Sequence, residues 1–284
     1  MLRHDVLSVA LLGVIISAGS SVEARAQDGP EDKDKDKAGA DWSLTVPRKG
    51  FCIQLLLDPA KLREIPDGVR LVPAEGYAEL HPVLRRVVSS QPEYRSWSPS
   101  SLCFYYLTRV VGASESIGED KDPTKAPVLG IWTVAGQTGT SGPENIVLDL
   151  RSNDGDLRDA ADHAGLELDK LTTSIGPVPR EDGPPRTEER RYQIKLGKTL
   201  LVWDGRGGED TTHTPAAVSW HWQARGPNRR WVTGELTLKP ASSTPMVGSL
   251  RVEGNDAMAR ALQASPIRYV GPSYEGGEGR LRLH

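Results

Sequence analysis

The alternation of apolar and polar positions in the second half of the chain predicts antiparallel strands. In residues 218–222 the two kinds of side chain fall on opposite faces, with Val218, Trp220 and Trp222 against Ser219 and His221. Residues 231–238 alternate in the same way. Residues 192–196 and 199–203 are separated by Gly197-Lys198, a two-residue turn signal with glycine first, which predicts a β-hairpin.

Continuous apolar runs in the first half, and two short runs near the end, predict further strands. Such runs are typical of strands that are covered on both faces. We expect strands at residues 51–57, 69–72, 102–111, 128–134, 146–150, 267–270 and 280–283.

A strand that leads into a capped helix is predicted within residues 145–168. The side-chain oxygen of Asn153 or Asp154 can accept a hydrogen bond from a first-turn N–H group, and Gly165 suits the helix end. Between them one apolar stripe follows at i, i+3, i+4 and i+7, formed by Leu157, Ala160, Ala161 and Ala164.

Helices are also expected at residues 81–88 and 255–264, and loops at two glycine-containing segments. Residues 175–189 are dense in proline, glycine and charge, which predicts a long surface loop, either a connector or a lid. Residues 204–210 are a glycine-rich loop candidate without the G-x-G-x-x-G spacing of a phosphate-binding turn. About ten strands with two or three short helices predict one α+β domain, mostly antiparallel and barrel-like or double-sheeted, over residues 41–284.

The first forty residues predict export. Residues 1–26 contain a short basic start, an apolar stretch and the small-x-small sequence Ala24-Arg25-Ala26, the pattern of a cleavable signal peptide. Residues 27–40 alternate in charge and predict a disordered linker. Because the apolar stretch is shorter than the ~20 residues of a membrane span, we expect a soluble periplasmic or extracellular protein with no membrane anchor after cleavage.

The two cysteines, Cys52 and Cys103, lie in the part that is predicted to be exported. Two thiols in an oxidising compartment are most often paired, so we expect a disulfide. The alternative interpretation is a thiol nucleophile.

Charge and motifs argue against several function classes. The net charge of −3 offers no basic footprint for nucleic acid, so no nucleic-acid partner is expected. The histidines form no short-spaced pair, so no metal site is expected. The sequence contains no G-x-S-x-G, H-E-x-x-H or C-x-x-C motif, and nothing in it calls for a cofactor.

Tryptophans on the predicted strands are the candidate ligand-binding residues. Tryptophan on a sheet either fills a core or lines a pocket for an apolar or ring-shaped small molecule, and the sequence leaves both uses open. His221, between two tryptophans, is either exposed to solvent or a polar group within an aromatic cavity. The candidate set is Trp132, Trp203, Trp220, Trp222 and His221.

The order of these elements resembles the acetoacetate decarboxylase superfamily. The similar segments are residues 65–73 (IPDGVRLVP), 148–165 (a strand and its helix), 191–203 (the hairpin), 234–240 and 268–283. The resemblance implies a barrel-like antiparallel sheet around a small-molecule cavity.

The catalytic pattern of that family is not preserved. The resemblance implies a Schiff-base lysine within E-x-x-G-x-P-K, but the glutamate falls on Asp162 and the lysine on Leu168, whereas Lys170 comes two residues later beside Asp169. A Schiff-base lysine needs an apolar pocket or a neighbouring cation to lower its pKa, and a nearby carboxylate has the opposite effect. Leu56 and Leu57 stand where the family has an arginine.

Three interpretations therefore stay open. The first is an exported protein whose cavity binds a small apolar or aromatic molecule without Schiff-base catalysis. The second is a decarboxylase-like lyase that uses Lys170 with Asp162; strict alternation after Gly165 would place Lys170 on the face of Leu166 and Leu168. The third is a structural or interaction protein with a filled core.

Overall fold

In the computed structural model the backbone of most of the chain after residue 40 is described. The described residues are 41–45, 49–62, 65–77, 82–107, 109–111, 116–117, 126–139, 142–163, 167–180, 183–184, 186, 188–207, 212–213, 216–223, 231–239, 242–244, 246–275 and 278–283. The predicted signal peptide and linker lie outside them.

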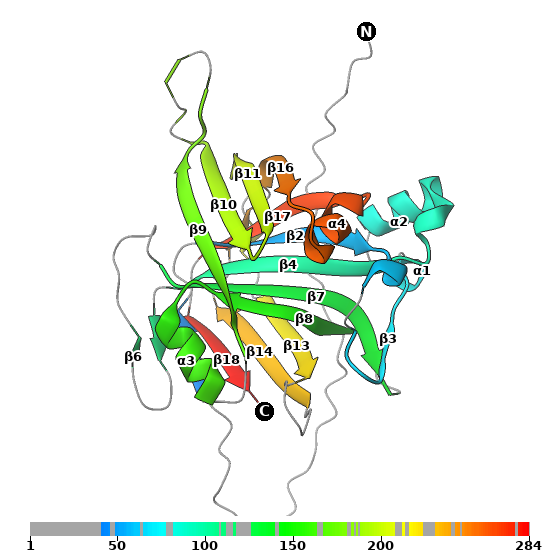
Figure 1. The fold of residues 1–284 in the computed structure, drawn as a ribbon, viewed down its shortest axis with the longest axis horizontal. Coiled ribbons are helices and arrows are strands. Elements are labelled where there is room, and N and C mark those ends of the chain that lie inside the picture. The colour runs from blue at the N-terminus through cyan, green and yellow to red at the C-terminus, as the bar shows by residue number, and fades with distance from the viewer. Residues whose placement is uncertain are drawn as a thin grey trace, which may run out of the picture.

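Strands dominate the described part, and they form one curled 18-stranded sheet that is antiparallel in most of its pairings (Figure 1). The strands of the first half are β1 (Asp41–Thr45), β2 (Lys49–Leu57), β3 (Val69–Leu71), β4 (Ser98–Tyr106), β5 (Arg109–Val111), β6 (Ser116–Ile117), β7 (Val128–Thr138) and β8 (Glu144–Ser152). Those of the second half are β9 (Asp169–Pro177), β10 (Arg190–Leu196), β11 (Thr199–Gly207), β12 (Thr212–His213), β13 (Ala216–Gln223), β14 (Trp231–Lys239), β15 (Ser242–Thr244), β16 (Met246–Glu253), β17 (Arg268–Glu275) and β18 (Glu278–Leu283).

Four α-helices and two 3-10 turns are present among the described residues. They are η1 (Pro59–Lys61), α1 (Ala74–Tyr77), α2 (Pro82–Ser90), η2 (Pro92–Tyr94), α3 (Gly155–His163) and α4 (Ala257–Ala264). None of the helices within the described ranges is long and apolar enough to cross a membrane. The expected α+β class, mostly antiparallel and barrel-like, is confirmed.

The central strands β2, β4 and β7 carry side chains on two interior faces, because successive residues of a strand point to opposite sides. One face holds Phe51, Phe104 and Trp132, which belong to the main hydrophobic core. The other face holds Cys52 and Cys103, which lie directly opposite each other in the β2–β4 register and form the expected disulfide. The cysteine prediction is therefore confirmed in the structure.

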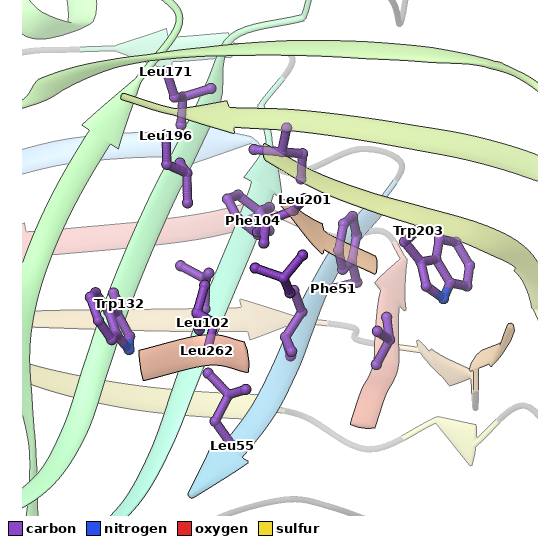
Figure 2. Close-up of a cluster of buried hydrophobic side chains, with 14 of the residues drawn as sticks. Phe51, Leu55, Leu102, Phe104, Trp132, Leu171, Leu196, Leu201, Trp203 and Leu262 are labelled. Atoms are coloured by element: carbon purple, nitrogen blue, oxygen red, sulfur yellow. The ribbon is translucent and has the colours of Figure 1, made fainter. Parts of the chain in front are cut away.

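The main core lies between these central strands and the strands β9, β10, β11 and β16. Figure 2 shows its side chains converging from both sides, with Leu102, Phe104 and Phe51 between Trp132 and Trp203. From the facing strands come Leu171, Ile194, Leu196 and Leu201, each at most 2 % exposed. Burial of this much apolar surface is the main stabilising contribution to such a fold.

Helix α4 covers the core at the end where β10 turns into β11. Ala261 and Leu262 pack into the core from this helix, and the partly buried Met258 packs against it, so the predicted inward face is confirmed. Asp256 is the N-cap: its Oδ1 accepts hydrogen bonds from the N–H of Ala259 (2.8 Å) and from the hydroxyl of Thr199 (2.6 Å). The cap therefore joins the helix to the start of β11.

Asp256→Ala is expected to lower the free energy of unfolding by about 1 kcal/mol at pH 7. Burial raises the pKa of this carboxyl, but the hydrogen bonds from Thr199, Ala259 and Lys198 and the charge of Arg151 outweigh burial and hold the pKa below its ordinary value. A pKa that is lowered in the folded state stabilises the fold above about pH 4, the unfolded value, and this contribution is lost as the pH falls through the folded value.

Urea denaturation at several pH values tests this expectation. Asp256→Asn is the matched control, because asparagine caps a helix about as well as aspartate but does not titrate. It should keep most of the stability at pH 7 and show a weaker loss between pH 5 and pH 2. Equal pH profiles for wild type and Asp256→Asn would contradict the assigned role.

The helix after β8 is also confirmed, with Asp154 as the residue that caps it. The Asp154 Oδ1 accepts a hydrogen bond from the N–H of Leu157 (2.7 Å), and Leu157 and Ala161 are buried at 1 % and 0 % exposure. The other candidate, Asn153, instead bridges to the start of β7, accepting from the N–H of Val128 and donating to the carbonyl of Ala126.

Two predicted loops were partly wrong. The predicted loop at residues 175–189 begins inside a strand, because β9 continues to Pro177 and pairs with β10 as far as Arg190. The predicted glycine-rich loop at residues 204–210 likewise begins inside β11, which pairs with β16 as far as Gly207. In both cases pairing with another strand outweighs the local preference of glycine and proline for turns: the partner is the next strand, β10, for β9 and the distant strand β16 for β11.

Candidate functional site

Four aromatic rings from four strands meet at the end of the core that is remote from α4. We define the aromatic cluster as Phe51 (β2), Tyr106 (β4), Tyr192 (β10) and Trp203 (β11). The Phe51 ring centroid lies 5.3 Å from Tyr192, 5.9 Å from Trp203 and 6.4 Å from Tyr106. The Tyr192 centroid lies 5.2 Å from Trp203 and 6.2 Å from Tyr106. These separations are those of rings in direct contact.

Two polar atoms of this cluster are buried without a hydrogen-bond partner. They are the Tyr106 hydroxyl and the Trp203 indole Nε1, and their side chains are 5 % and 2 % exposed. The third such atom in the described part of the chain is the Ser98 hydroxyl, at the opposite end of β4. Buried polar groups in native proteins nearly always have a hydrogen-bond partner, so two buried polar atoms without one in a single cluster need an explanation.

The Tyr106 hydroxyl is held in its neutral form. Burial, with a smaller contribution from Tyr192, raises its pKa well above the ordinary value of tyrosine. A neutral hydroxyl can donate one hydrogen bond as well as accept, while an indole N–H can only donate. The cluster therefore offers two donors to whatever would pair with them.

The indole of Trp203 is held in place by two glycines. Gly205 and Gly248 face each other in the β11–β16 register, and the indole lies across them. A Cβ at Gly205 would lie 2.3 Å from the Trp203 Cζ2, and one at Gly248 would lie 2.9 Å from the Nε1. The indole can occupy this position because neither residue of the pair has a side chain. These two glycines are therefore required for packing of Trp203.

Some inner-face residues beside the cluster are partly exposed to solvent. Inner-face residues there are only partly buried: Ile175 pairs with Tyr192, Leu250 pairs with Trp203, and Met246 pairs with Gly207. At the other end α4 covers the sheet, and Leu57 and Leu201 are at most 2 % exposed.

Trp132 differs from Trp203 in that its polar atom is paired. Its indole Nε1 donates to the hydroxyl of Ser100 (3.0 Å), which in turn donates to the carbonyl of Thr133 (2.6 Å). Trp132 is 7 % exposed and lies at the opposite side of the core from Trp203 in Figure 2. Trp132 is therefore a core residue whose one polar atom has a hydrogen-bond partner.

The remaining predicted ligand-binding residues lie elsewhere. Trp220 is buried against Tyr105, at a ring centroid distance of 6.0 Å, on the disulfide side of the central strands. His221 lies on β13 opposite Ile146 of β8 and is partly buried. Trp222 is on the same strand, but its side chain is outside the described set. Of the five candidates, the structure brings Trp132 and Trp203 into one core.

Phe51, Tyr106 and Tyr192 were not among the sequence candidates. Each lies in a segment with strand-like patterning, but the sequence does not reveal which strands face each other. The alternation of Tyr192, Ile194 and Leu196 was the available signal for an inward tyrosine, and these three residues are at most 4 % exposed.

Lys170 and Asp162 lie apart from the aromatic cluster. Lys170 is the second residue of β9 and is exposed, whereas the next residue, Leu171, is 1 % exposed. Lys170 thus points away from the core, because the inward positions of β9 begin with Leu171. Leu166, with which Lys170 was predicted to share a face, lies outside the described residues. Asp162 is exposed in the last turn of α3.

The neighbourhood of Lys170 is charged. Arg151 pairs with Asp149 (2.5 Å) and Asp169 (3.5 Å), and its Nη1 donates to the carbonyl of Lys170 (3.4 Å). Leu56 and Leu57, where the family pattern has an arginine, are both fully buried. Within the described ranges, no three His, Cys, Asp or Glu side chains are grouped so that they could hold a metal ion.

Taken together, the sheet and the cluster define a curled, mostly antiparallel α+β fold with an aromatic core. No family model matches the sequence, and no curated protein sequence matches it. Some solved structures, in contrast, are similar to this chain. The enduracididine biosynthesis enzyme MppR complexed with pyruvate superposes with a TM-score of 0.51 at 10 % identity, over 89 % of this chain and 91 % of that one.

Two further structures are similar. MppR with HEPES buffer bound gives a TM-score of 0.51 at 11 % identity, covering 93 % of this chain and 96 % of the other. An acetoacetate decarboxylase-like enzyme from Sphingomonas wittichii RW1 gives 0.45 at 12 % identity, covering 88 % and 94 %. The chain therefore shares the overall fold of MppR, and at these identities the likeness concerns the fold alone.

Proposed function

We propose that this protein is an exported binder of a small organic molecule, which it holds at the aromatic cluster without forming a Schiff base. The observation that carries the proposal is the pair of unpartnered, buried donors at Tyr106 and Trp203 within one group of touching rings. The rings supply apolar surface and the donors supply orientation, which is the usual composition of a small-molecule site.

The two donors destabilise the fold as long as they have no hydrogen-bond partner. A buried polar group without a partner destabilises a fold by about 1–3 kcal/mol. Phenylalanine in place of Tyr106 would keep the ring packing without that cost. A ligand that accepts hydrogen bonds from one or both groups would offset it, which gives a reason for tyrosine and tryptophan at these positions.

The structural neighbours support a binding role for this fold. One of the MppR structures holds pyruvate and another holds a buffer molecule. We extend to this chain only the capacity to enclose a small molecule.

The absence of Schiff-base chemistry is inferred from Lys170. A neutral amine at working pH needs desolvation or a cationic neighbour, whereas the Lys170 side chain is exposed on a strand that begins with Asp169. Export is inferred from the N-terminal pattern, and the Cys52–Cys103 disulfide supports it, because such bonds persist in oxidising compartments.

Native mass spectrometry of protein exported by its own leader tests the binding role. We expect a noncovalent small-molecule adduct that is lost on denaturation, and a reduction of roughly tenfold or more in its occupancy in Tyr106→Phe and Trp203→Phe. Trp231→Phe is the matched control, because Trp231 is 38 % exposed. In the ligand-free state Tyr106→Phe should be about 1 kcal/mol more stable than wild type, since it removes an orphan hydroxyl.

The binding proposal fails if wild type carries no adduct and its tryptophan fluorescence does not respond to small-molecule extracts of the producing cells. It also fails if Tyr106→Phe is less stable than wild type in the ligand-free state, because the hydroxyl would then have a partner within the protein.

Incubation with acetoacetate or pyruvate followed by borohydride is expected to leave the mass of the protein unchanged. A Schiff base would be reduced to a stable secondary amine, which mass spectrometry detects. Lys170→Arg is the control for site assignment. An adduct that maps to Lys170 in the wild type and is missing from Lys170→Arg would establish the lyase interpretation instead.

A further inference from the structure

We propose that the protein forms a two-fold symmetric dimer in which the β9 strands of two copies pair with each other, antiparallel, about Ser174. The pairing uses the outer edge of β9 and does not depend on the binding role proposed above.

Strand β9 lies at the edge of a four-stranded part of the sheet. The strands β9, β10, β11 and β16 follow one another in that order, with β9 outermost (Figure 1). β9 pairs with β8 only through its first two residues, Asp169 and Lys170. From there to Pro177 it pairs only with β10 among the described strands. An edge strand has a row of backbone N–H and C=O groups that can pair with another chain.

The hairpin turn determines which residues of β9 have their backbone groups on this free edge. The residues that flank a two-residue turn form a hydrogen-bonded pair, so the backbone of Leu196 faces β11. The direction alternates along a strand, so the backbone of Gln193 faces β9 and bonds to Ser174. The N–H and C=O groups of Thr173 and Ile175 therefore face outward, where no described residue bonds to them.

The other edge of these four strands, β16, is covered. The same alternation places the carbonyl of Val252 on the outer edge of β16, and this carbonyl accepts a hydrogen bond from the Gln263 side chain of α4 (3.1 Å). Within the described part of the chain β9 has no such cover. Exposed edges are usually protected by charged residues or proline, whereas residues 171–176 (LTTSIG) contain neither and include threonine and isoleucine, which favour strands. This edge is therefore suited to pairing.

A second copy of β9 fits the edge because Thr173 and Ile175 lie symmetrically on either side of Ser174. With a two-fold axis at Ser174, Thr173 of each copy lies opposite Ile175 of the other, and the free N–H and C=O groups of both residues are satisfied. Both side chains are β-branched and lie on the inner face, where they pack against each other across the strands. Between residues 171 and 177 no charges are opposed.

The length of β9 also fits this register. Pro177 of the second copy would lie opposite Leu171, and the next position along the edge, beside Lys170, is occupied by Ser152 of β8. Because β9 ends at Pro177, the second strand fills the free edge and stops before it meets β8. A two-fold interface of this kind is closed, so association ends at the dimer.

Sedimentation analysis of the mature protein over a roughly hundredfold range of concentration tests the dimer. Pairing through one short strand buries less than the ~1,200 Å² of a standard interface, so we expect a dissociation constant roughly in the micromolar range. Thr173→Pro should raise it roughly tenfold or more, because it removes an outward N–H but no bond to β10, and edge strands tolerate such a proline. Thr173→Val keeps the N–H and the side-chain shape and should dimerise like wild type.

Cross-linking tests the register independently. The only two cysteines of the sequence, Cys52 and Cys103, are bonded to each other, so an introduced cysteine is the one free thiol. Ser174→Cys should form a disulfide-linked dimer on mild oxidation, because Ser174 faces its own copy at a non-hydrogen-bonded pair, with Cα atoms about 4.5 Å apart. Thr172→Cys, on the same exposed face, is the control: its copy would lie roughly 14 Å away, and it should stay monomeric.

Three results would overturn the proposed dimer. They are a monomeric wild type at every concentration, a folded Thr173→Pro that dimerises as tightly as wild type, and equal cross-linking of the two cysteine variants. If wild type is monomeric, the β9 edge does not pair with its own copy. Circular dichroism establishes whether Thr173→Pro is folded, and if it is not, the two cysteine variants still decide.

Discussion

Loss of the Cys52–Cys103 disulfide is expected to lower the free energy of unfolding by about 4 kcal/mol. The two cysteines are 51 residues apart in sequence, and a cross-link of that span removes roughly this much unfolded-state entropy in the chain model. The bond joins β2 to β4 in the centre of the sheet, and its cysteines are 4 % and 6 % exposed. Urea denaturation of wild type and of Cys52→Ala/Cys103→Ala gives the difference.

The double variant also removes two sulfur atoms from the core, so a second comparison is needed. Wild type that has been reduced while unfolded keeps both thiols, and its stability under reducing conditions isolates the cross-link from the packing. We expect most of the loss in the free energy of unfolding to appear both in the double variant and in the reduced wild type. A loss of less than 1 kcal/mol in reduced wild type would show that the bond contributes little to stability. Because both sulfur-bearing side chains are buried, reductant should act on the folded protein far more slowly than on the unfolded chain.

Elements with local signals were predictable from the sequence. The N-cap aspartates Asp154 and Asp256, the hairpin turn at Gly197 and the apolar runs of β2 and β7 all act within a few residues. Their positions in the structure follow these signals, with Gly197 at a positive φ of 62° as a tight hairpin turn requires. Local chemistry therefore determines most of the element order, and with it the fold class.

Strand ends that depend on pairing with another strand were not predictable. The last residues of β9 and β11 have a composition that favours turns, and they are strands because β10 and β16 supply hydrogen-bond partners. In the same way, the sequence does not show that Gly205 and Gly248 face each other. Their pairing is what gives the Trp203 indole its place.

The candidate site was only partly predictable for a related reason. Tryptophan content indicated an aromatic interior, but the central strands have two covered faces, and the sequence does not assign a tryptophan to one of them. Trp132 and Trp203 lie on the core side, whereas Trp220 packs against Tyr105 on the disulfide side. Whether a polar atom is paired is likewise a tertiary property, as the contrast between Trp132, bonded to Ser100, and Trp203 shows.

Phe51→Ala is expected to destabilise the protein by about 3–5 kcal/mol, the largest effect of any single substitution considered. Truncation of a buried phenylalanine removes its transfer free energy and leaves a cavity. Phe51 is 1 % exposed and contacts the rings of Phe104, Tyr106, Tyr192 and Trp203. Chemical denaturation measures the loss, with Val247→Ala as the exposed control, at 57 % exposure, for which a change within 0.5 kcal/mol is expected.

The size of the Phe51 effect depends on how firmly the surrounding rings are held. Tyr192 and Trp203 come from β10 and β11, which pair with each other along their length, while Phe104 and Tyr106 come from β4. Because the four rings are held by β4 on one side and by the paired strands β10 and β11 on the other, they cannot all move into the space left by Phe51. The cavity should therefore persist. Added benzene should then stabilise Phe51→Ala more than wild type, since an apolar ligand can fill an engineered apolar cavity. A loss below 1 kcal/mol, or no response to benzene, would mean that the rings close over the gap and that the cluster is too pliable to hold a ligand in one orientation.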